Sequence, residues 1–212
     1  MEIRKENNSV TLVRDKEQME FTYVKEDIIR CRYTSGEWAE SDSMIIEDRG
    51  DREEISAGIK ESSDGIIIYG GAVKAAVSAQ SFETMWMRAS DDGILLAEGK
   101  KEFIQVPVMK YTTGGEMPVI DRVKTVDGER NFIRNLKEVE DHKAWQGRLH
   151  FRFTEDEHIH GLGQAEEGIY DYRGHVQYLY QHNMRIPMPV MVSDKGYGIL
   201  FDCTSLISTT TL

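Results

Sequence analysis

The sequence predicts an all-β fold, an antiparallel β-sandwich with few or no helices. Three observations point to this class. Short segments alternate apolar and polar residues with a period of two, which is typical of half-buried strands. Asp-Gly pairs separate several of these segments and favour hairpin turns. The composition, with 18 Gly, nine Tyr and seven Phe among 212 residues, suits strands joined by many turns.

The alternation is clearest in the first third of the chain. In residues 9–15, SVTLVRD, one face of the expected strand carries Val10, Leu12 and Arg14. In residues 19–35, the apolar and aromatic residues fall at odd positions: Phe21, Tyr23, Ile29, Cys31 and Tyr33. These side chains are expected to form one wall of a core, because alternate residues of a strand point to the same face of the sheet.

Hairpin turns are expected at three Asp-Gly pairs: Asp64-Gly65, Asp92-Gly93 and Asp127-Gly128. Each pair lies beside apolar alternating segments. Asp and Gly both tolerate the positive φ values of a type I′ turn, so the pairs predict antiparallel strand pairs.

Two segments of the second half are less plain. Residues 131–146, NFIRNLKEVEDHKAWQ, fit a helix or a strand followed by a loop equally well. Pro187 and Pro189 in IPMPV indicate an edge strand or its entry, because proline cannot donate to a central ladder.

Length and charge restrict the function classes. We expect a single domain over residues 1–212. The formal net charge of −11 repels phosphate backbones and argues against nucleic-acid binding. No apolar run is long enough to cross a bilayer, and MEIRKENNSV lacks the apolar core of a secretory signal. We therefore expect a cytoplasmic protein without membrane contact, in which Cys31 and Cys203 are reduced thiols.

The segment HIHGLGQAEEGIYDYRGH, residues 158–175, gathers polar and glycine residues that admit several interpretations. His158 and His160 followed by Glu166 or Glu167 resemble the ligand set of a cupin-like metal enzyme, but the glycine expected before the first histidine is missing. The simpler interpretation puts both histidines on a solvent-facing strand with Ile159 in the core, and no metal or other cofactor is expected. GLGQ lacks the third glycine of a dinucleotide loop and the Gly-Lys-Ser/Thr of a P-loop.

Covalent catalysis has no support in the sequence, whereas sugar binding has some. No Gly-x-Ser-x-Gly elbow is present, and neither cysteine has a histidine nearby in sequence. Residues 170–173, YDYR, and 178–183, YLYQHN, mix aromatic rings with planar polar groups, as carbohydrate sites do, although such residues also serve in packing.

The last sixty residues resemble the N-terminal domain of glycoside hydrolase family 31, the α-glucosidase and α-xylosidase family. In that family, one strand ends in E-x-hydrophobic-x-G-L-G, and a later strand ends in S-x-K/R-G-Y-G-hydrophobic-L. This chain has Glu157, Gly161, Leu162, Gly163 and Gln164, and then Ser193, Lys195, Gly196, Tyr197, Gly198, Leu200, Phe201 and Asp202. Cys203 departs from the pattern, because many members carry Asn there.

The resemblance implies a galactose-mutarotase-like supersandwich and a non-catalytic role beside a catalytic TIM barrel. In the family, the barrel follows this domain in the same polypeptide and holds the nucleophile and the acid/base; no W-x-D-M-N stretch of the nucleophile is present here. We therefore expect the barrel to be absent and this chain to be inactive alone. The full-length enzyme would be a retaining exo-α-glycosidase that acts on an α-linked oligosaccharide or glycoside.

By position in the family, the loop from Gln164 to Pro187 would help shape the sugar pocket. The residues that this implies as substrate-binding are Asp171, Arg173, His182 and Asn183. The GLG glycines are expected to let the chain turn and approach a neighbouring strand closely. Two alternatives remain open: a free-standing carbohydrate-binding β-sandwich, and the cupin-like metal enzyme.

Overall fold

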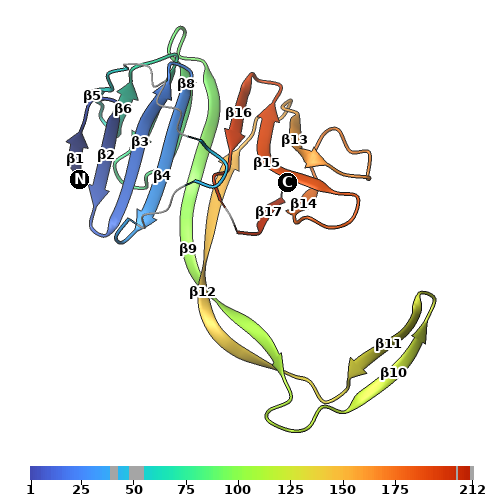
Figure 1. Cartoon of the computed structure of the whole chain (residues 1–212). Helices are drawn as coiled ribbons and strands as arrows, with labels where there is room; N and C mark the ends of the chain where they lie inside the picture. The colour runs from blue at the N-terminus through green and yellow to red at the C-terminus, as the bar shows by residue number, and fades with distance from the viewer. Residues whose placement is uncertain (39–42, 48–54, 204, 211–212) are drawn as a thin grey trace. The chain divides into compact units, whose positions relative to one another are not determined.

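The structure is a computed structural model that describes residues 1–38, 43–47, 55–203 and 205–210. Contacts within the chain define two compact units: unit 1 comprises Met1–Lys100 and His150–Leu212, and unit 2, which we call the insert, comprises Lys101–Leu149. The described residues contain strands and no helix, which confirms the all-β class (Figure 1). The described residues therefore include no helix that is long and apolar enough to cross a membrane.

Two sheets of unit 1 arise from the alternating segments. The first sheet has the order β1-β2-β3-β4, with antiparallel strands β1 (Glu2–Lys5), β2 (Ser9–Arg14), β3 (Glu17–Lys25) and β4 (Ile28–Ser35). The second sheet has the order β12-β9-β8-β7-β6-β5. Its strands are β5 (Gly58–Glu61), β6 (Gly65–Tyr69), β7 (Val73–Ser78), β8 (Thr84–Arg88), β9 (Ile94–Thr112) and β12 (Lys137–Arg152).

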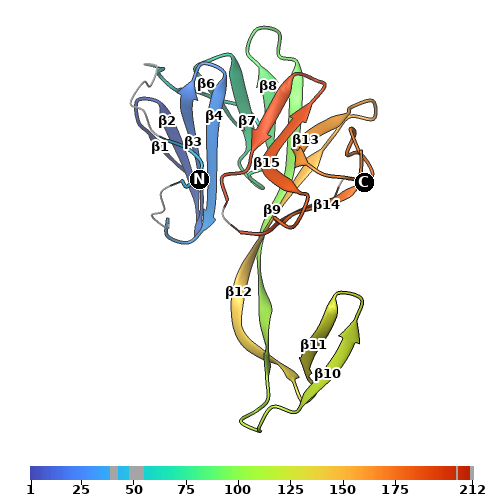
Figure 2. The same ribbon diagram turned by 45° about the vertical axis from the view of Figure 1, so that its right-hand side comes forward.

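The core between these two sheets confirms the predicted sandwich (Figure 2). The first sheet contributes Val10, Leu12, Met19, Phe21 and Tyr23, all fully buried, and the second contributes Ile66, Ile68, Ala75 and Val77. The expected odd-numbered residues of β4 are partly buried and pack against the same core. The period-two pattern therefore identified the inner face of the first sheet correctly, because the apolar face of each strand is the face that meets the second sheet.

The three Asp-Gly pairs lie at antiparallel connections, but the predicted type I′ geometry is wrong. A type I′ turn needs a positive φ at both central residues. In these pairs, all of which the structure describes, φ is positive at Asp92 (+59°) and at Gly128 (+112°) but not at their partners, and at neither residue of Asp64-Gly65. The connections before β6 and β9 are longer than two residues, and Gly128 already belongs to the strand β11.

Two small sheets complete unit 1. One has the order β13-β15-β16, from β13 (Ile159–Gln164), β15 (Ile186–Ser193) and β16 (Tyr197–Leu200), and the other pairs β14 (Val176–Leu179) with β17 (Ile207–Thr210). A second core holds Ile159, Leu162, Tyr172 and Met191, with Phe153, Ile169, Leu179, Ile199 and Phe201 packed against it. The expected inward position of Ile159 is confirmed.

The sequence indicated an edge strand or its entry for Pro187 and Pro189. The edge alternative is wrong, because β15 is the middle strand of its sheet, whereas the entry alternative agrees with the position of Pro187 as the second residue of β15. The two prolines are tolerated because they lie in the first half of β15, whereas β16 pairs only with Val190–Ser193. Pro189 also lies in a bulge, where three residues of β15 oppose the single residue Leu162. A missing N–H does little harm where the ladder is already interrupted.

The insert contains the distal parts of β9 and β12 and a separate hairpin of β10 (Ile120–Thr125) and β11 (Gly128–Ile133). Residues 131–146, which the sequence left undecided, belong to β11 and β12 and the short link between them. In the insert, which the structure describes throughout, no residue is buried.

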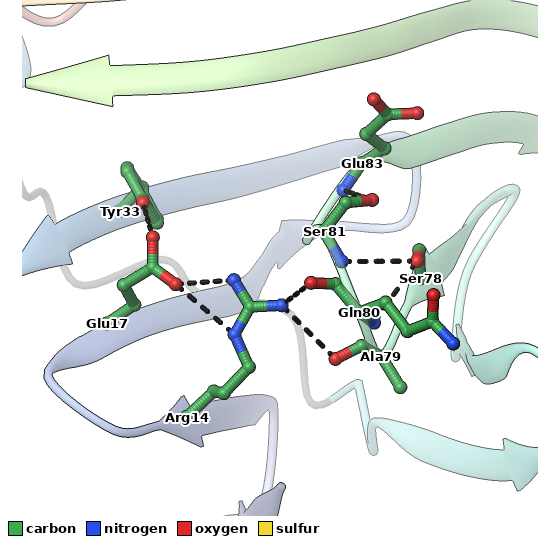
Figure 3. Close-up of polar contacts among 8 residues, drawn as sticks. All are labelled: Arg14, Glu17, Tyr33, Ser78, Ala79, Gln80, Ser81 and Glu83. Carbon is green, nitrogen blue, oxygen red and sulfur yellow. Dashed lines mark hydrogen bonds and ion pairs between the residues drawn. The ribbon is translucent and has the colours of Figure 1, made fainter.

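An arginine joins the two sheets of the main sandwich at one end (Figure 3). The guanidinium of Arg14 on β2 donates to the carboxylate of Glu17 on β3 and to the carbonyls of Ala79 and Gln80 in the turn after β7. The hydroxyl of Tyr33 on β4 donates to the same carboxylate. Burial alone would raise the pKa of Glu17, but the hydrogen bonds from Arg14 and Tyr33 outweigh it and lower this pKa.

Replacing Arg14 by methionine should lower the free energy of unfolding by about 1–2 kcal/mol, because Glu17 loses its cation and two turn carbonyls lose a donor. The value is modest because the Arg14 and Glu17 side chains stay 25% and 33% exposed. Urea unfolding followed by circular dichroism measures it. Arg4→Met is the control, because the Arg4–Glu2 pair is 59% exposed at both partners and should change stability little. Equal effects of the two substitutions would contradict the bridging role.

Candidate functional site

A buried carboxylate organises the start of the segment that the sequence singled out. Glu157, just before β13, is only 3% exposed. Its Oε1 accepts hydrogen bonds from the hydroxyls of Ser193 (2.6 Å) and Tyr197, and its Oε2 accepts the backbone N–H of Thr154 (2.9 Å) and the Thr154 hydroxyl (3.3 Å). Burial raises the pKa of Glu157, but the donors reverse this effect, so the net pKa is lowered. Glu157 is therefore an ionised group that ties β13 to the end of β15 and the start of β16.

The two glycines of GLG have the conformation and the contacts expected of them. Gly161 and Gly163 both have a φ of +99°, which L side chains rarely adopt. A Cβ atom at Gly163 would lie 2.0 Å from the carbonyl oxygen of Ile186, so only glycine lets β13 approach β15 so closely. Leu162, between them, also has a positive φ (+60°) and places its side chain in the second core. These residues form the bulge opposite Pro189 and have a structural role.

Asp171 is held by a clamp of three donors. Its Oδ1 accepts the backbone N–H groups of Ile159 and Arg173, both at 3.1 Å, and its Oδ2 lies 2.6 Å from Nδ1 of His158. The hydrogen bond to His158 and the two amides lower the pKa of Asp171, and the same hydrogen bond raises the pKa of His158. The clamp fixes the chain after Ile169 against the start of β13.

The other predicted site residues lie on both sides of β14, which interrupts the expected loop. Arg173 precedes β14, and its guanidinium lies 5.4 Å above the ring centre of Phe153. His182 and Asn183 follow β14 and are exposed, and Nδ1 of His182 lies 2.8 Å from the carbonyl oxygen of Asn183. No hydrogen bond among the described residues joins Asp171 or Arg173 to this second pair.

Exposed tyrosines accompany these polar groups. Tyr170, Tyr178 and Tyr180 are 85%, 58% and 63% exposed. A hollow lined by Tyr178 and by residues such as Leu162, Gln164, Tyr172 and Pro187 has room for about one water molecule and is too small for a sugar ring. The segment therefore presents aromatic and polar groups on an open surface, and a pocket for a sugar would need a second wall.

The residues of the metal alternative have other interactions. His158 contacts Asp171, Nδ1 of His160 lies 2.5 Å from the carbonyl oxygen of Tyr170, and Glu167 pairs with Arg185. Among the described residues, no group of three or more His, Cys, Asp or Glu is arranged to hold a metal ion. Both cysteines are thiols, Cys31 partly buried and Cys203 exposed.

The interactions that organise this site were missed at the level of sequence. Glu157, Ser193 and Tyr197 were recognised as motif residues, but their convergence on one carboxylate was not predicted. The available signal for a buried acid was the position of Glu157, two residues before the core residue Ile159, because alternate residues of a strand share a face. The pairing of His158 with Asp171 had no sequence signal, because the two residues are 13 positions apart and the intervening turn sets their distance.

Comparisons with known proteins bear on the whole chain. Residues 18–208 match the model of the glycosyl hydrolase 31 N-terminal galactose mutarotase-like domain. An α-xylosidase of Saccharolobus solfataricus is 38% identical over an 82-residue alignment, which covers 34% of this chain and 11% of that protein.

Solved structures share the fold. The chain is similar to a glycoside hydrolase family 31 α-xylosidase from Xanthomonas citri (TM-score 0.70, 21% identity, 97% of this chain and 19% of that one). It is also similar to an α-xylosidase of the same family from a soil metagenome, solved with xylose (TM-score 0.66, 17% identity, 99% and 29%). A dextranase from Flavobacterium johnsoniae has a TM-score of 0.65 at 14% identity, over 99% and 23% of the chains. The chain thus spans less than a third of the length of each of these relatives.

Glu157→Gln should destabilise the chain by about 2–3 kcal/mol, because an amide nitrogen would face one of the donors that now meet a carboxylate. The pKa of Glu157 is lowered by folding, so its contribution is present above the unfolded value of about 4.3 and is lost as pH falls through the folded value. Urea unfolding at neutral and at acid pH measures both effects. Glu155→Gln is the exposed neighbour control; a similar loss there would show that the network is not the cause.

The His158–Asp171 contact should appear as a raised histidine pKa in an NMR titration of the ring protons. Folding raises the pKa of His158 and lowers the pKa of Asp171, so the contact should be fully present between about pH 3.9 and 6.5. It weakens as pH rises through the His158 value or falls through the Asp171 value. Asp171→Asn should return the pKa of His158 toward about 6.5. Asp194→Asn, which removes a weaker charge effect on His158, should change it less; the reverse order would contradict the clamp.

Proposed function

Because this chain belongs to the family of glycosyl hydrolase 31 N-terminal galactose mutarotase-like domains, we propose that it is the non-catalytic domain of a retaining exo-α-glycosidase. The family expected from the GLGQ and SDKGYG stretches is confirmed by the match over residues 18–208. The activity, the substrate and the catalytic partner of the complete protein are part of the proposal, since the chain covers 11% of its α-xylosidase relative.

The catalytic partner in this proposal is a TIM barrel in the same polypeptide. A retaining glycosidase needs two carboxyl groups about 5–5.5 Å apart, one to attack the anomeric carbon and one to protonate the leaving oxygen. The barrel would supply both. The residues of this chain would bind and orient the sugar from outside, since barrel sites are formed by loops at the carboxyl ends of the strands.

The observation that carries the proposal is the presentation of residues 170–183 on a fixed scaffold. The clamp on Asp171 and the pairing of β14 with β17 hold the backbone, while Tyr170, Tyr178 and Tyr180 remain exposed. Tyrosine rings can stack on the apolar face of a sugar, and Arg173, His182 and Asn183 can hydrogen-bond its hydroxyl groups. Asp171, whose oxygens already accept three donors, would act as a positioning residue beside them.

We propose an α-xyloside as the substrate class, within the wider class of α-linked glycosides. Three relatives support this choice, because the curated relative and two of the solved structures are named α-xylosidases. The dextranase relative keeps α-glucan open as the competing substrate.

A free-standing carbohydrate-binding module is the second candidate, and the exposed tyrosines favour it. The two candidates differ in what the 212-residue chain does alone. As an accessory domain it should show little affinity for xylose or an α-xyloside in calorimetry, because it supplies only one wall of a pocket. Saturable binding by the chain alone, lost on Tyr180→Ala, would favour the binding module.

In the full-length enzyme, Asn183→Ala should raise KM for an aryl α-xyloside and lower kcat/KM. The loss of transition-state binding should be about 1–2 kcal/mol, the cost of one lost hydrogen bond to substrate. The side chain of Asn183 is exposed, so the fold should be unaffected. Asn131→Ala, which truncates another exposed asparagine in the insert, is the control and should leave the kinetics unchanged. Unchanged kinetics for both variants, with native circular dichroism, would show that Asn183 has no part in substrate binding.

A further inference from the structure

The strand β15 is apolar on both of its faces. Residues 186–192, IPMPVMV, contain no polar side chain, whereas β3 alternates core residues with Gln18, Glu20 and Thr22. A strand without this alternation is typical of a sheet that is covered on both sides. One face of β15 is covered, because Met191 is 4% exposed and belongs to the second core. The other face needs an explanation.

The register of the three-stranded sheet places the apolar residues of this other face side by side. Val192 lies opposite His160 of β13 and Gly198 of β16, and Val190 lies opposite Leu200. Directly opposite residues of antiparallel strands share a face. A Cβ atom at Gly198 would indeed lie 3.9 Å from Cγ2 of Val192. The surface that results, which we call the outer face, contains Ile186, Met188, Val190, Val192 and Leu200.

The outer face is open to solvent within unit 1. Ile186, Met188, Val192 and Leu200 are 56%, 52%, 44% and 48% exposed. Exposure alternates along β15 on both sides of the bulge at Pro189, so the bulge does not mix the two faces. The positions opposite the outer-face residues are His160, Gln164 and Gly198, so no Asp, Glu, Lys or Arg lies among them. An apolar centre without charges is typical of a permanent interface.

The outer face adjoins the proposed sugar-binding residues 170–183. Gln164, the last residue of β13, lies opposite Ile186, the first residue of β15, so the chain between them leaves the sheet at this end. Tyr178 and Gln164 line the same small hollow. The second wall that a sugar pocket requires must therefore stand close to the Ile186 end of the outer face.

One partner can supply both the second wall and the cover. In the proposed function, this partner is a TIM barrel in the same polypeptide. The two α-xylosidases of known structure match 97% and 99% of this chain with only 19% and 29% of their own length. A barrel that follows β17 is tethered beside residues 170–183, because β17 pairs with β14. Tethering gives it an effective concentration that a second copy of the chain lacks.

We propose that the outer face of β15 is the surface on which the catalytic barrel docks, and that this contact positions residues 170–183 at the sugar pocket. The inference rests on the proposed function and adds to it the surface that joins the two domains. Met188 lies between Ile186 and Val190 on this surface, and its unbranched side chain can adapt to the surface that covers it.

Peroxide oxidation of methionine, followed by peptide mass spectrometry, measures the cover directly. In the 212-residue chain, Met188 and the control Met85 on β8, which is 40% exposed, should oxidise at similar rates. In the full-length protein, Met188 should oxidise about tenfold more slowly, because the barrel shields it, and Met85 should be unchanged.

Two results of this measurement would overturn the docking surface. One is a Met188 that oxidises equally fast in the 212-residue chain and in the full-length protein. The other is protection of Met188 in the 212-residue chain that grows with protein concentration, since a second copy would then be the cover.

Met188→Glu tests whether the docked surface positions the sugar-binding residues. In the full-length enzyme it should lower kcat/KM for an aryl α-xyloside about tenfold, because an unpaired carboxylate would be buried in the contact. Met85→Glu is the matched control and should leave the kinetics unchanged. Both variants of the 212-residue chain should keep native circular dichroism, because both methionines are exposed there. Equal kinetics for the two full-length variants would contradict the positioning role.

The same experiments separate this inference from the proposed function. A full-length protein that cleaves the α-xyloside while Met188 stays unprotected overturns the docking surface and leaves the proposed function intact. A full-length protein that protects Met188 but cleaves neither aryl α-xyloside nor aryl α-glucoside supports a docked domain and overturns the proposed function.

Discussion

The carboxylate of Glu157 is the interaction on which the presentation of residues 158–183 depends. Its oxygens accept four donors from Thr154, Ser193 and Tyr197, so the start of β13, the end of β15 and the start of β16 meet at one buried charge. A buried carboxylate is tolerable only when donors replace its water. The hydrogen bonds to Glu157 therefore restrict the relative positions of the three strands more than apolar packing alone would.

The position of β13 in turn determines the contacts of the residues after Glu157. With β13 fixed, two glycines at a φ of +99° let it approach β15, and Leu162 turns into the core between them. The residue after Glu157, His158, then reaches Asp171, whose carboxylate also binds the amides of Ile159 and Arg173. The exposed tyrosines and polar groups are thus presented from a scaffold that is ordered by its own hydrogen bonds, as functional loops on rigid sheets are.

Unit 1 and the insert differ in the interactions that could stabilise them. Unit 1 has two apolar cores, and Arg14 links its main sheets at one end. The insert has strands of good length and paired charges but no interior. Strand propensity and hairpin chemistry can shape such a ribbon, but only burial against another surface can stabilise it. Unit 1 and the insert therefore have different physical requirements within one chain.

By itself, the sequence determined the all-β class, the inner face of β2–β4 and the family, because strand alternation and glycine-rich motifs depend on local chemistry. Tertiary structure decided the rest. The central place of β15 and the strand identity of residues 137–146 depend on partner strands distant in sequence, and the Asp-Gly turn type depends on where the flanking strands end and begin. Glu157 with Tyr197 and His158 with Asp171 became partners for the same reason. A hydrogen bond between residues 13 or 40 positions apart exists only once the backbone between them is folded, and no local pattern encodes its distance.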